Sequence, residues 1–303
     1  MNSKDIVPIV DAGRLPNYSK VFDMLDVAES TREDYKVRIS LFLKFVKNGG
    51  FTRNTFLEFK RYLSQRQDYS VSTKNKYLIT AKIFLRELSR QGVLPDTTQN
   101  VKVFSQSRKH KRDGLTEQEM AVLVESVGRM PQQDPQTARL KALLGLLIYQ
   151  GLRQIEIARL DVADIDTVAK TAMIRGKGED DREAIDLHPE TCRLLSEYMK
   201  SNRISDGPLF ASKSNNSRNR RLSTRAVRWI IKQVLKDAGI DKTTHGFRHH
   251  FVSKLIKEYR GDLITVQGYS RHRSLEMLTV YNDRVKKEND LPRFYSTFAG
   301  VGL

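Results

Sequence analysis

Apolar residues recur every three or four positions along much of the chain, which is the spacing of the buried face of an amphipathic helix. In the first hundred residues this pattern occurs in three stretches, Tyr35–Val46, Phe56–Leu63 and Tyr77–Leu88. The aromatic residues in these stretches fall on one face of each helix. We therefore interpret them as core residues rather than as groups that stack on bases. The pattern predicts a small helical domain over residues 20–104.

Two short motifs predict where helices begin. Ser30 followed by Glu33, and Thr116 followed by Glu119, both have the spacing of a capping box. In that motif the hydroxyl and the carboxylate each accept a hydrogen bond from a free backbone amide of the first turn. Leu115, just before the second box, is placed to pack against Met120. The second motif predicts that a new domain opens near residue 114.

The remaining chain, residues 114–303, reads as mostly helical with one small β-hairpin. A strongly apolar helix is predicted over Leu140–Ile148, with Gly151 at its C-cap. Short strands are predicted at Thr171–Ile174 and Glu183–Leu187, and they are joined by a turn over residues 176–181. Further helical spacing covers Val227–Leu235 and Phe251–Tyr259. The predicted fold class is mainly α with a small β-hairpin in the second domain, whose tail starts near residue 285.

Residues 105–113, between the two domains, form a polar and basic run with no apolar residue to anchor it. Its cations are Arg108, Lys109, Lys111 and Arg112. Such a run is either a solvated tether or a strap that touches DNA. We favour the strap because the whole chain is strongly basic.

The charge of the chain indicates a polyanionic partner. There are 53 Lys and Arg against 36 Asp and Glu, a net charge of +17 and a pI near 9.9. Nucleic acid is the commonest polyanion. A membrane surface is the weaker alternative, because no stretch combines a basic face with a broad apolar one. A second basic cluster is expected either to contact DNA or to be a solvated loop. Its members are Lys213, Arg218, Arg220 and Arg221.

Several other classes of protein are disfavoured. The longest apolar stretch, residues 143–149, is too short for a membrane span, and the N-terminus has no signal-peptide pattern. One cysteine, Cys192, permits no internal disulfide and fits a reducing cytoplasm, where we expect the protein to associate with the nucleoid. We find no phosphate-binding glycine loop, no His-Glu-x-x-His and no Cys-x-x-Cys. The sequence therefore predicts neither a metal nor a cofactor.

Five pieces of sequence, in order, resemble the signature of the tyrosine recombinase (phage integrase) family. Gly151-Leu-Arg153-Gln-Ile-Glu156 is similar to its first box, and His245-Gly-Phe-Arg248-His249 to its second. His272 followed nine residues later by Tyr281 resembles its last histidine and nucleophile. Lys177 lies in the predicted hairpin turn, where the family has a catalytic lysine. The helical domain ahead of the basic linker is similar to the family's core-binding domain.

The resemblance implies a role for each matched residue. Tyr281 would attack the scissile phosphate and form a 3′-phosphotyrosyl link, and Lys177 would protonate the leaving oxygen. His245 and His272 would bind phosphate oxygens and help to manage the proton of the tyrosine. Glu156 would orient Arg153, and His249 would be a buried hydrogen-bonding residue rather than a catalyst. Tyr269 and Tyr295 are rival nucleophiles without the matching distance from His272.

Elementary chemistry agrees with these roles. A tyrosine hydroxyl has a pKa near 10, so it attacks phosphorus only among cations and a proton acceptor. Arg153 and Arg248 can each hold a phosphate oxygen through a planar guanidinium. Two arginines and a lysine can thus replace the metal ions of other nucleases.

The sequence departs from the family pattern in two places. Ser270-Arg271 stands where Leu-Gly usually precedes the last histidine, and Glu179, Asp180 and Asp181 follow Lys177 in the turn.

The resulting hypothesis is a site-specific recombinase that acts on inverted repeats in duplex DNA as a homotetramer, through a Holliday junction. A type IB topoisomerase-like enzyme and a non-catalytic DNA-binding regulator are the alternatives. The target sequence and the direction of recombination stay open. The tail, residues 282–303, is expected to dock on its own subunit or, as the resemblance favours, on a neighbouring one.

Overall fold

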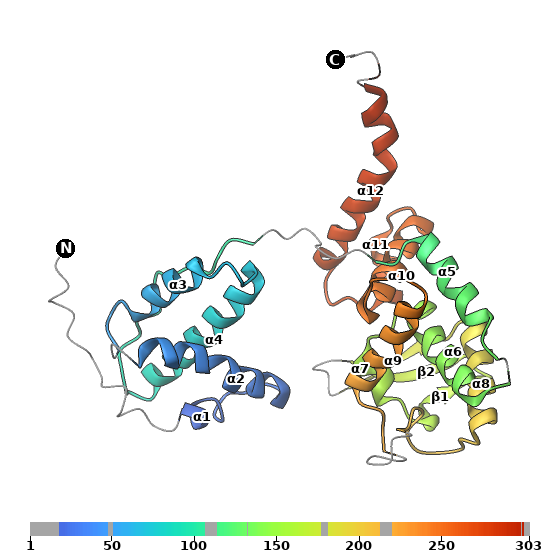
Figure 1. The fold of residues 1–303 in the computed structure, drawn as a ribbon, viewed down its shortest axis with the longest axis horizontal. Helices are drawn as coiled ribbons and strands as arrows, with labels where there is room; N and C mark the ends of the chain where they lie inside the picture. Colours follow the sequence, from blue (N-terminus) through green and yellow to red (C-terminus); the bar gives the residue numbers. More distant parts are fainter. Residues whose placement is uncertain are drawn as a thin grey trace. The chain divides into compact units, whose positions relative to one another are not determined.

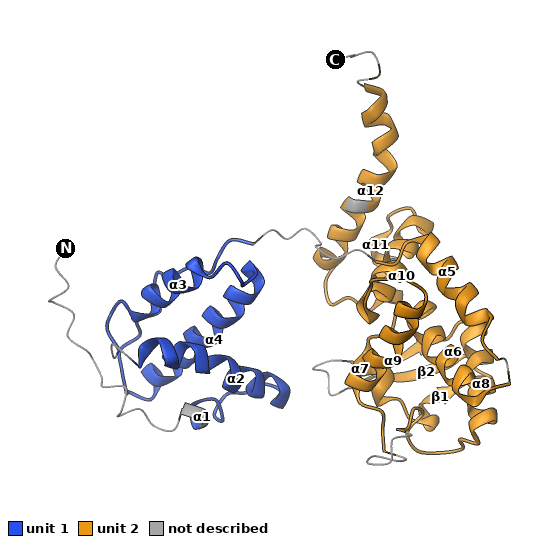
Figure 2. Cartoon of the chain, viewed as in Figure 1, with its two compact units in different colours: residues 1–107 blue, residues 108–303 orange. Residues whose placement is uncertain are grey.

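The computed structural model describes residues 18–47, 51–106, 114–131, 133–176, 181–212, 220–297 and 299. The chain divides into two compact units, Met1–Ser107 and Arg108–Leu303 (Figure 2). The division falls inside the predicted linker. Most of that linker, residues 107–113, lies outside the described residues.

Unit 1 is a bundle of helices around an aromatic core. Phe42, Phe59 and Phe84 are fully buried, and the rings of Phe42 and Phe59 meet edge to face with centroids 4.9 Å apart. The interpretation of these aromatics as core residues is therefore confirmed. The helices are α1 (Tyr18–Val21), α2 (Glu29–Val46), α3 (Thr55–Gln65) and α4 (Val71–Arg90).

The capping box predicted at Ser30 is wrong. α2 begins at Glu29, its N-cap is Ala28, and no side chain caps it. The reason is tertiary: the Arg32 guanidinium donates to the carbonyls of Phe22 and Leu25 at 3.2 and 3.0 Å. These contacts fix the incoming chain so that the helix starts two residues earlier than the local motif predicts, with Ala28 instead of Ser30 as the N-cap.

Unit 2 consists of helices around a small sheet (Figure 1). Its helices, beside the short 3₁₀ turn η2 (Val162–Asp164), are α5 (Glu117–Gly128), α6 (Pro135–Ile148), α7 (Gln154–Arg159), α8 (Pro189–Asn202), α9 (Thr224–Asp237), α10 (Thr244–Glu258), α11 (Leu263–Ser270) and α12 (Leu275–Thr297). The mainly α fold class with a small antiparallel sheet is confirmed. No described helix is both long and apolar enough to cross a membrane.

The sheet is antiparallel in the order β1 (Ile165–Asp166), β2 (Thr171–Arg175) and β3 (Arg182–Asp186). β2 and β3 form the predicted hairpin, with Ala172 opposite Ile185. Ala172 and Ile174 are buried, whereas the alternate residues of β2 are not, so one face of the hairpin covers the core. β1 was not predicted, because two residues carry no detectable period.

The apolar helix α6 lies at the centre of unit 2. Consecutive residues of a helix point to different sides, and Ala142, Leu143 and Leu144 are all buried, since α8 and α10 pack against it. The C-cap prediction at Gly151 is wrong, because α6 ends at Ile148 with Tyr149 as its C-cap.

Gly151 has a different reason to be glycine. Its φ is +57°, and a Cβ there would lie 2.4 Å from the Phe251 ring on α10. Because of this close approach, the segment between α6 and α7 packs directly against α10.

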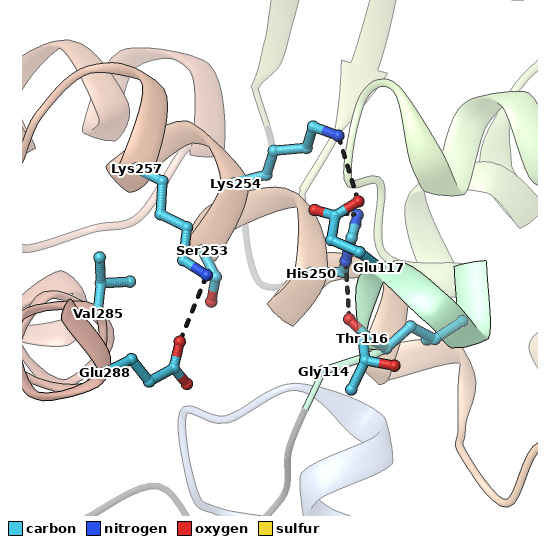
Figure 3. Close-up of a pocket in the computed structure, with 10 residues that line it drawn as sticks. Gly114, Thr116, Glu117, His250, Ser253, Lys254, Lys257, Val285 and Glu288 are labelled. Atoms are coloured by element: carbon cyan, nitrogen blue, oxygen red, sulfur yellow. Dashed lines mark hydrogen bonds and ion pairs between the residues drawn. The ribbon is translucent and has the colours of Figure 1, made fainter. Parts of the chain in front are cut away.

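The first described residues of unit 2 are anchored to α10 as well. A Cβ on Gly114 would lie 2.7 Å from the His250 backbone nitrogen, so only glycine fits. The His250 ring donates through Nδ1 to the Leu115 carbonyl at 2.7 Å (Figure 3). The predicted capping box of Thr116 and Glu119 is present at the start of α5. The linker therefore enters unit 2 on the helix that carries the second motif.

Candidate active site

The first motif forms the start of α7. Arg153 is its N-cap residue, and the Glu156 carboxylate turns back to accept from the Arg153 backbone N–H at 2.8 Å. Glu156 also accepts from the Arg153 guanidinium at 2.7 Å. Glu156 is 1% exposed, whereas the Arg153 side chain is 29% exposed. A buried carboxylate thus holds a partly exposed guanidinium at the surface of the site.

The second motif lies on the first turns of α10. Arg248 is buried and donates to the Gly151 carbonyl at 2.8 Å and to the Ser270 carbonyl. His245 is exposed one turn earlier, and its ring meets that of His249 edge-on with centroids 4.5 Å apart. Arg248 therefore joins the chain after α6 to the end of α11.

The third histidine follows the last turn of α11. The His272 ring is buried, and its Nδ1 lies 2.8 Å from the Ser270 hydroxyl. Between them Arg271 caps α11 in the left-handed conformation, with φ +53°. The Arg271 side chain lies 7% exposed, and its guanidinium donates to Glu156 at 3.1 Å.

Tyr281 reaches this group from α12, which packs with α10 and α11 (Figure 1). Its hydroxyl lies 2.5 Å from Nδ1 of His249, and its ring centroid is 6.0 Å from that of His272. Leu278 and Val285, one turn to each side, are buried and hold this part of α12 in place. The predicted nucleophile is thus buried beside both histidines.

Burial and positive charge set the protonation of these groups. Burial raises the pKa of Tyr281 to about 12, although the charges of Arg248 and Arg153 oppose that rise. Burial lowers the pKa of Arg248 to about 9, with Arg153 and Arg271 acting in the same direction. Near neutral pH the tyrosine is therefore protonated and the guanidinium charged.

The pKa values of His272 and Glu156 are both lowered, which keeps the histidine neutral and the carboxylate charged. Burial lowers the pKa of His272 to about 3, and the nearby charges of Arg248 and Arg153 add to this. Burial alone would raise the pKa of Glu156, but the charges of Arg271 and Arg153 outweigh it, so that the pKa lies below its ordinary value. The site therefore carries three arginine charges against one carboxylate.

Such a set of groups can bind an anion and act on it. Arg153 and Arg248 present fork-shaped donors, His272 is a neutral hydrogen-bonding ring, and Tyr281 supplies a hydroxyl. Among the described residues no group of three or more His, Cys, Asp or Glu is placed to hold a metal ion. Phosphate is an anion that this geometry fits, because its charge and several oxygens match converging guanidiniums.

Some predicted site residues fall outside the described part of the chain: Lys177, Arg108, Lys109, Lys111, Arg112, Arg218 and Lys213. Arg220 is described and exposed. Arg221 donates to the carbonyls of Ala158 and Leu160 and pairs with Asp161 at 2.5 Å. Its guanidinium is thus engaged within unit 2, and a DNA contact would have to compete with these bonds.

The rival nucleophiles lie elsewhere on the surface. Tyr269 is 48% exposed and stacks near Tyr259, and Tyr295 is 64% exposed beside Phe294 near the end of α12. Among the described contacts neither side chain meets Arg153, Arg248 or His272, although the Tyr269 backbone carbonyl accepts a long hydrogen bond from Arg271 at 3.4 Å. The geometry favours Tyr281.

Sequence reasoning missed two features of the site. Arg271 was noticed only as a departure from a motif, because nothing local shows that it reaches Glu156. For α9 only the buried apolar residues of the sequence were considered, and not the exposed face. That face, with the exposed Trp229 between its cations, carries Arg225, Arg228, Lys232 and Lys236. The spacing of three and four between these cations was the available signal. α9 packs against α7, so its basic face belongs to the surroundings of Arg153.

Known proteins are similar to the chain over both units. Tyrosine recombinase XerC of Roseiflexus sp. (strain RS-1) is 29% identical over 275 residues, covering 86% of this chain and 85% of that protein. Tyrosine recombinase XerD of Mycobacterium leprae (strain TN) is 32% identical over 176 residues, 55% of each chain.

Solved structures share the fold. A post-cleavage complex of the XerH site-specific recombinase with palindromic difH substrate has a TM-score of 0.71 at 20% identity, covering 87% of this chain and 79% of that one. A lambda integrase tetramer bound to a Holliday junction has a TM-score of 0.67 at 16% identity, with coverages of 93% and 79%. Residues 114–288, more than half of the chain and all of the site described above, match the phage integrase family. The chain belongs to the phage integrase family, the tyrosine recombinases.

Proposed function

We propose that this protein is a site-specific DNA recombinase in which Tyr281 is the nucleophile. The observation that carries the proposal is the placement of the Tyr281 hydroxyl, 2.5 Å from His249, next to the buried Arg248 and His272. Membership of the family supports the same reaction.

In the proposed reaction the Tyr281 oxygen attacks the scissile phosphorus and the bond to the 5′ oxygen breaks. Arg153 and Arg248 bind the two non-bridging oxygens, whose charge grows as the pentacoordinate state forms. Lys177 gives a proton to the leaving 5′ oxygen. The phosphotyrosine keeps the energy of the broken bond, so a 5′ hydroxyl of the partner strand can reverse the step without a nucleotide cofactor.

The tyrosine must lose its proton as it attacks. His249 lies closest to the hydroxyl, but both groups are buried, and the pKa of Tyr281 near 12 keeps it protonated in the free protein. We propose that DNA binding brings the phosphate and its arginines around the hydroxyl, so that only in the complex does the proton pass to the ring nitrogen of a neighbouring histidine. The uncomplexed protein is therefore in a resting state.

The proposed substrate is duplex DNA with an inverted repeat, bound by four copies that exchange strands through a Holliday junction. Two similar proteins support this: the XerH complex contains a palindromic substrate, and the lambda integrase complex is a tetramer on a Holliday junction. We place the activity in the cell interior, where the DNA is, with association to the nucleoid as the finer expectation.

A covalent-adduct assay tests the proposal. A nicked duplex that contains an inverted repeat selected by binding to the purified protein should trap a protein–DNA adduct that resists detergent and forms in EDTA. Tyr281→Phe should bind the duplex and form none, while Tyr269→Phe, the matched control, should form it normally. An adduct that persists in Tyr281→Phe would refute the assignment. If the wild-type protein formed no adduct, the regulator hypothesis would gain, whereas an adduct without Holliday junctions would favour the topoisomerase-like alternative.

A further inference from the structure

Arg271 occupies a backbone conformation that its residue type disfavours. Its φ of +53° and ψ of +47° lie in the left-handed region, where a Cβ crowds the following carbonyl and glycine is preferred. The position caps α11 immediately before His272. A large side chain at such a position needs a compensating interaction.

That interaction is a buried ion pair with Glu156, 115 positions away in the sequence. The Arg271 guanidinium donates to Oε2 of Glu156 at 3.1 Å, while Oε1 accepts from the Arg153 guanidinium at 2.7 Å. Arg271 and Glu156 are 7% and 1% exposed, so water screens their attraction little. Arg271 and Arg153 thus hold the same carboxylate from two sides.

The carboxylate controls where Arg153 points. Glu156 is the described acceptor for the Arg153 guanidinium, and it also caps the backbone of the same residue. A carboxylate that is free to rotate would allow several orientations of that guanidinium. With one oxygen held by Arg271, fewer orientations satisfy both cations.

The turn that carries Arg271 is connected to the other side of the site as well. The Ser270 carbonyl accepts from Arg248, and the Ser270 hydroxyl contacts the His272 ring at 2.8 Å. The turn of residues 270–272 therefore carries His272, contacts Arg248 and, through Glu156, is linked to Arg153. The Arg271 Nε has no hydrogen-bond partner among the described residues, and Nη1 makes only a long bond of 3.4 Å to the Tyr269 carbonyl, so Nη2 to the Glu156 carboxylate is the strong contact of this guanidinium.

We infer that Arg271 is a positioning residue that orients the phosphate-binding Arg153 through the Glu156 carboxylate. The inference rests on the proposed function, because it assigns Arg153 to the scissile phosphate. Arg271 itself touches no reacting atom. Its side chain joins the end of α11 to α7, and this contact limits the orientation of the Arg153 guanidinium.

The test compares two glycine substitutions at left-handed arginines. Arg271→Gly removes the ion pair and relieves the backbone. Arg260→Gly, the matched control, relieves the same conformation at φ +50° at an exposed arginine after α10. On the nicked duplex, Arg271→Gly should form adduct about 10²-fold more slowly than wild type, the effect expected when a reacting group is misplaced by about an ångström. Arg260→Gly should cleave at the wild-type rate.

Four further measurements separate positioning from a general structural role. Thermal unfolding and duplex affinity of Arg271→Gly should stay close to wild type. Guanidinium ion, below denaturing concentrations, should restore part of the cleavage rate by occupying the place of the deleted side chain. In a Glu156→Gln background Arg271→Gly should cause no further decrease in rate, because both changes break the same chain of contacts.

If the wild-type protein forms the adduct and Arg271→Gly forms it equally fast, the inference is overturned and the proposed function stays intact. Effects that add in the Glu156→Gln background, or a decrease in duplex affinity equal to the decrease in cleavage, would also overturn it. They would indicate an action that does not pass through Glu156. Failure of the wild-type protein itself to form an adduct would instead be a failure of the proposed function.

Discussion

Neutral His272 is surrounded by buried positive charge, and this makes the fold sensitive to acid. The pKa of His272 is near 6.5 when unfolded and about 3 when folded, lowered by burial and by Arg248 and Arg153. Between these values the unfolded chain takes up a proton that the folded chain refuses. Stability therefore decreases as the pH falls from about 6.5 towards 3.

The expected decrease from this histidine between pH 7 and pH 5 is about 2 kcal/mol, because one pKa unit corresponds to roughly 1.4 kcal/mol. His272→Gln, which keeps a neutral polar group beside Ser270, should lack that part of the pH dependence. Urea unfolding of both proteins at the two pH values measures it. Equal slopes with pH would show that another group is responsible.

At the residue scale, the spacing of the motifs indicated which residues would lie close together. Arg153, Arg248 and Tyr281 belong to motifs whose order and separation are visible in the chain, and the fold brings them to one site. Arg271 was beyond reach, because its left-handed backbone and its partner Glu156 depend on how α11 packs near α7. His249 was predicted to be a buried hydrogen-bonding residue, but its partner, the Tyr281 hydroxyl, was not predicted.

Helices and strands were predictable where the apolar pattern continued over many residues and where a local motif marked the end. α4 and α6 have clear apolar faces, and the box of Thr116 and Glu119 marks α5. The start of α2 was misplaced because Arg32 binds distant carbonyls, and β1 is too short to show a period. Local signals fail at such points since tertiary contacts decide the boundary.

The basic face of α9 leads to a prediction about salt. Arg225, Lys232 and Lys236 lie exposed at a helical spacing, as expected for a helix against the phosphates of duplex DNA. Replacing each by Gln should reduce the slope of log K against log salt by about 0.9 for every phosphate that the helix no longer neutralises. Lys200→Gln serves as a comparison, because Lys200 is exposed on α8, which packs on α6 and not on the helices of the site. Fluorescence anisotropy across a salt series measures the slopes, and unchanged slopes would mean that the face is only solvated.

The chain as a whole ends in a helix that its own unit covers only in part. The beginning of α12 is buried at Leu278, Tyr281 and Val285, whereas Phe294 and Tyr295 are 54% and 64% exposed. Large apolar groups at the end of a helix favour docking on another surface, and the family resemblance favours a neighbouring protomer. The nucleophile and the tail lie on this one helix.

Truncation after Lys287 tests this. The change removes the Glu288–Lys257 ion pair and the exposed end of α12, so the cost in stability should be at most about 1 kcal/mol. Single-site binding should survive, and synapsis of two sites should be abolished or the pattern of cleavage altered. Gel shifts and thermal unfolding measure both. A truncated protein that unfolds or fails to bind a single site would place the tail in its own core.

The two units have separate hydrophobic cores, one around Phe42 and Phe84 and the other around α6. Neither core needs residues of the other to be filled. Unit 1 could therefore be exchanged for that of a relative without disturbing the core that holds Arg153, Arg248 and Tyr281. A chimera joined within residues 105–113 should fold, and its choice of target would follow the donor of unit 1 in part.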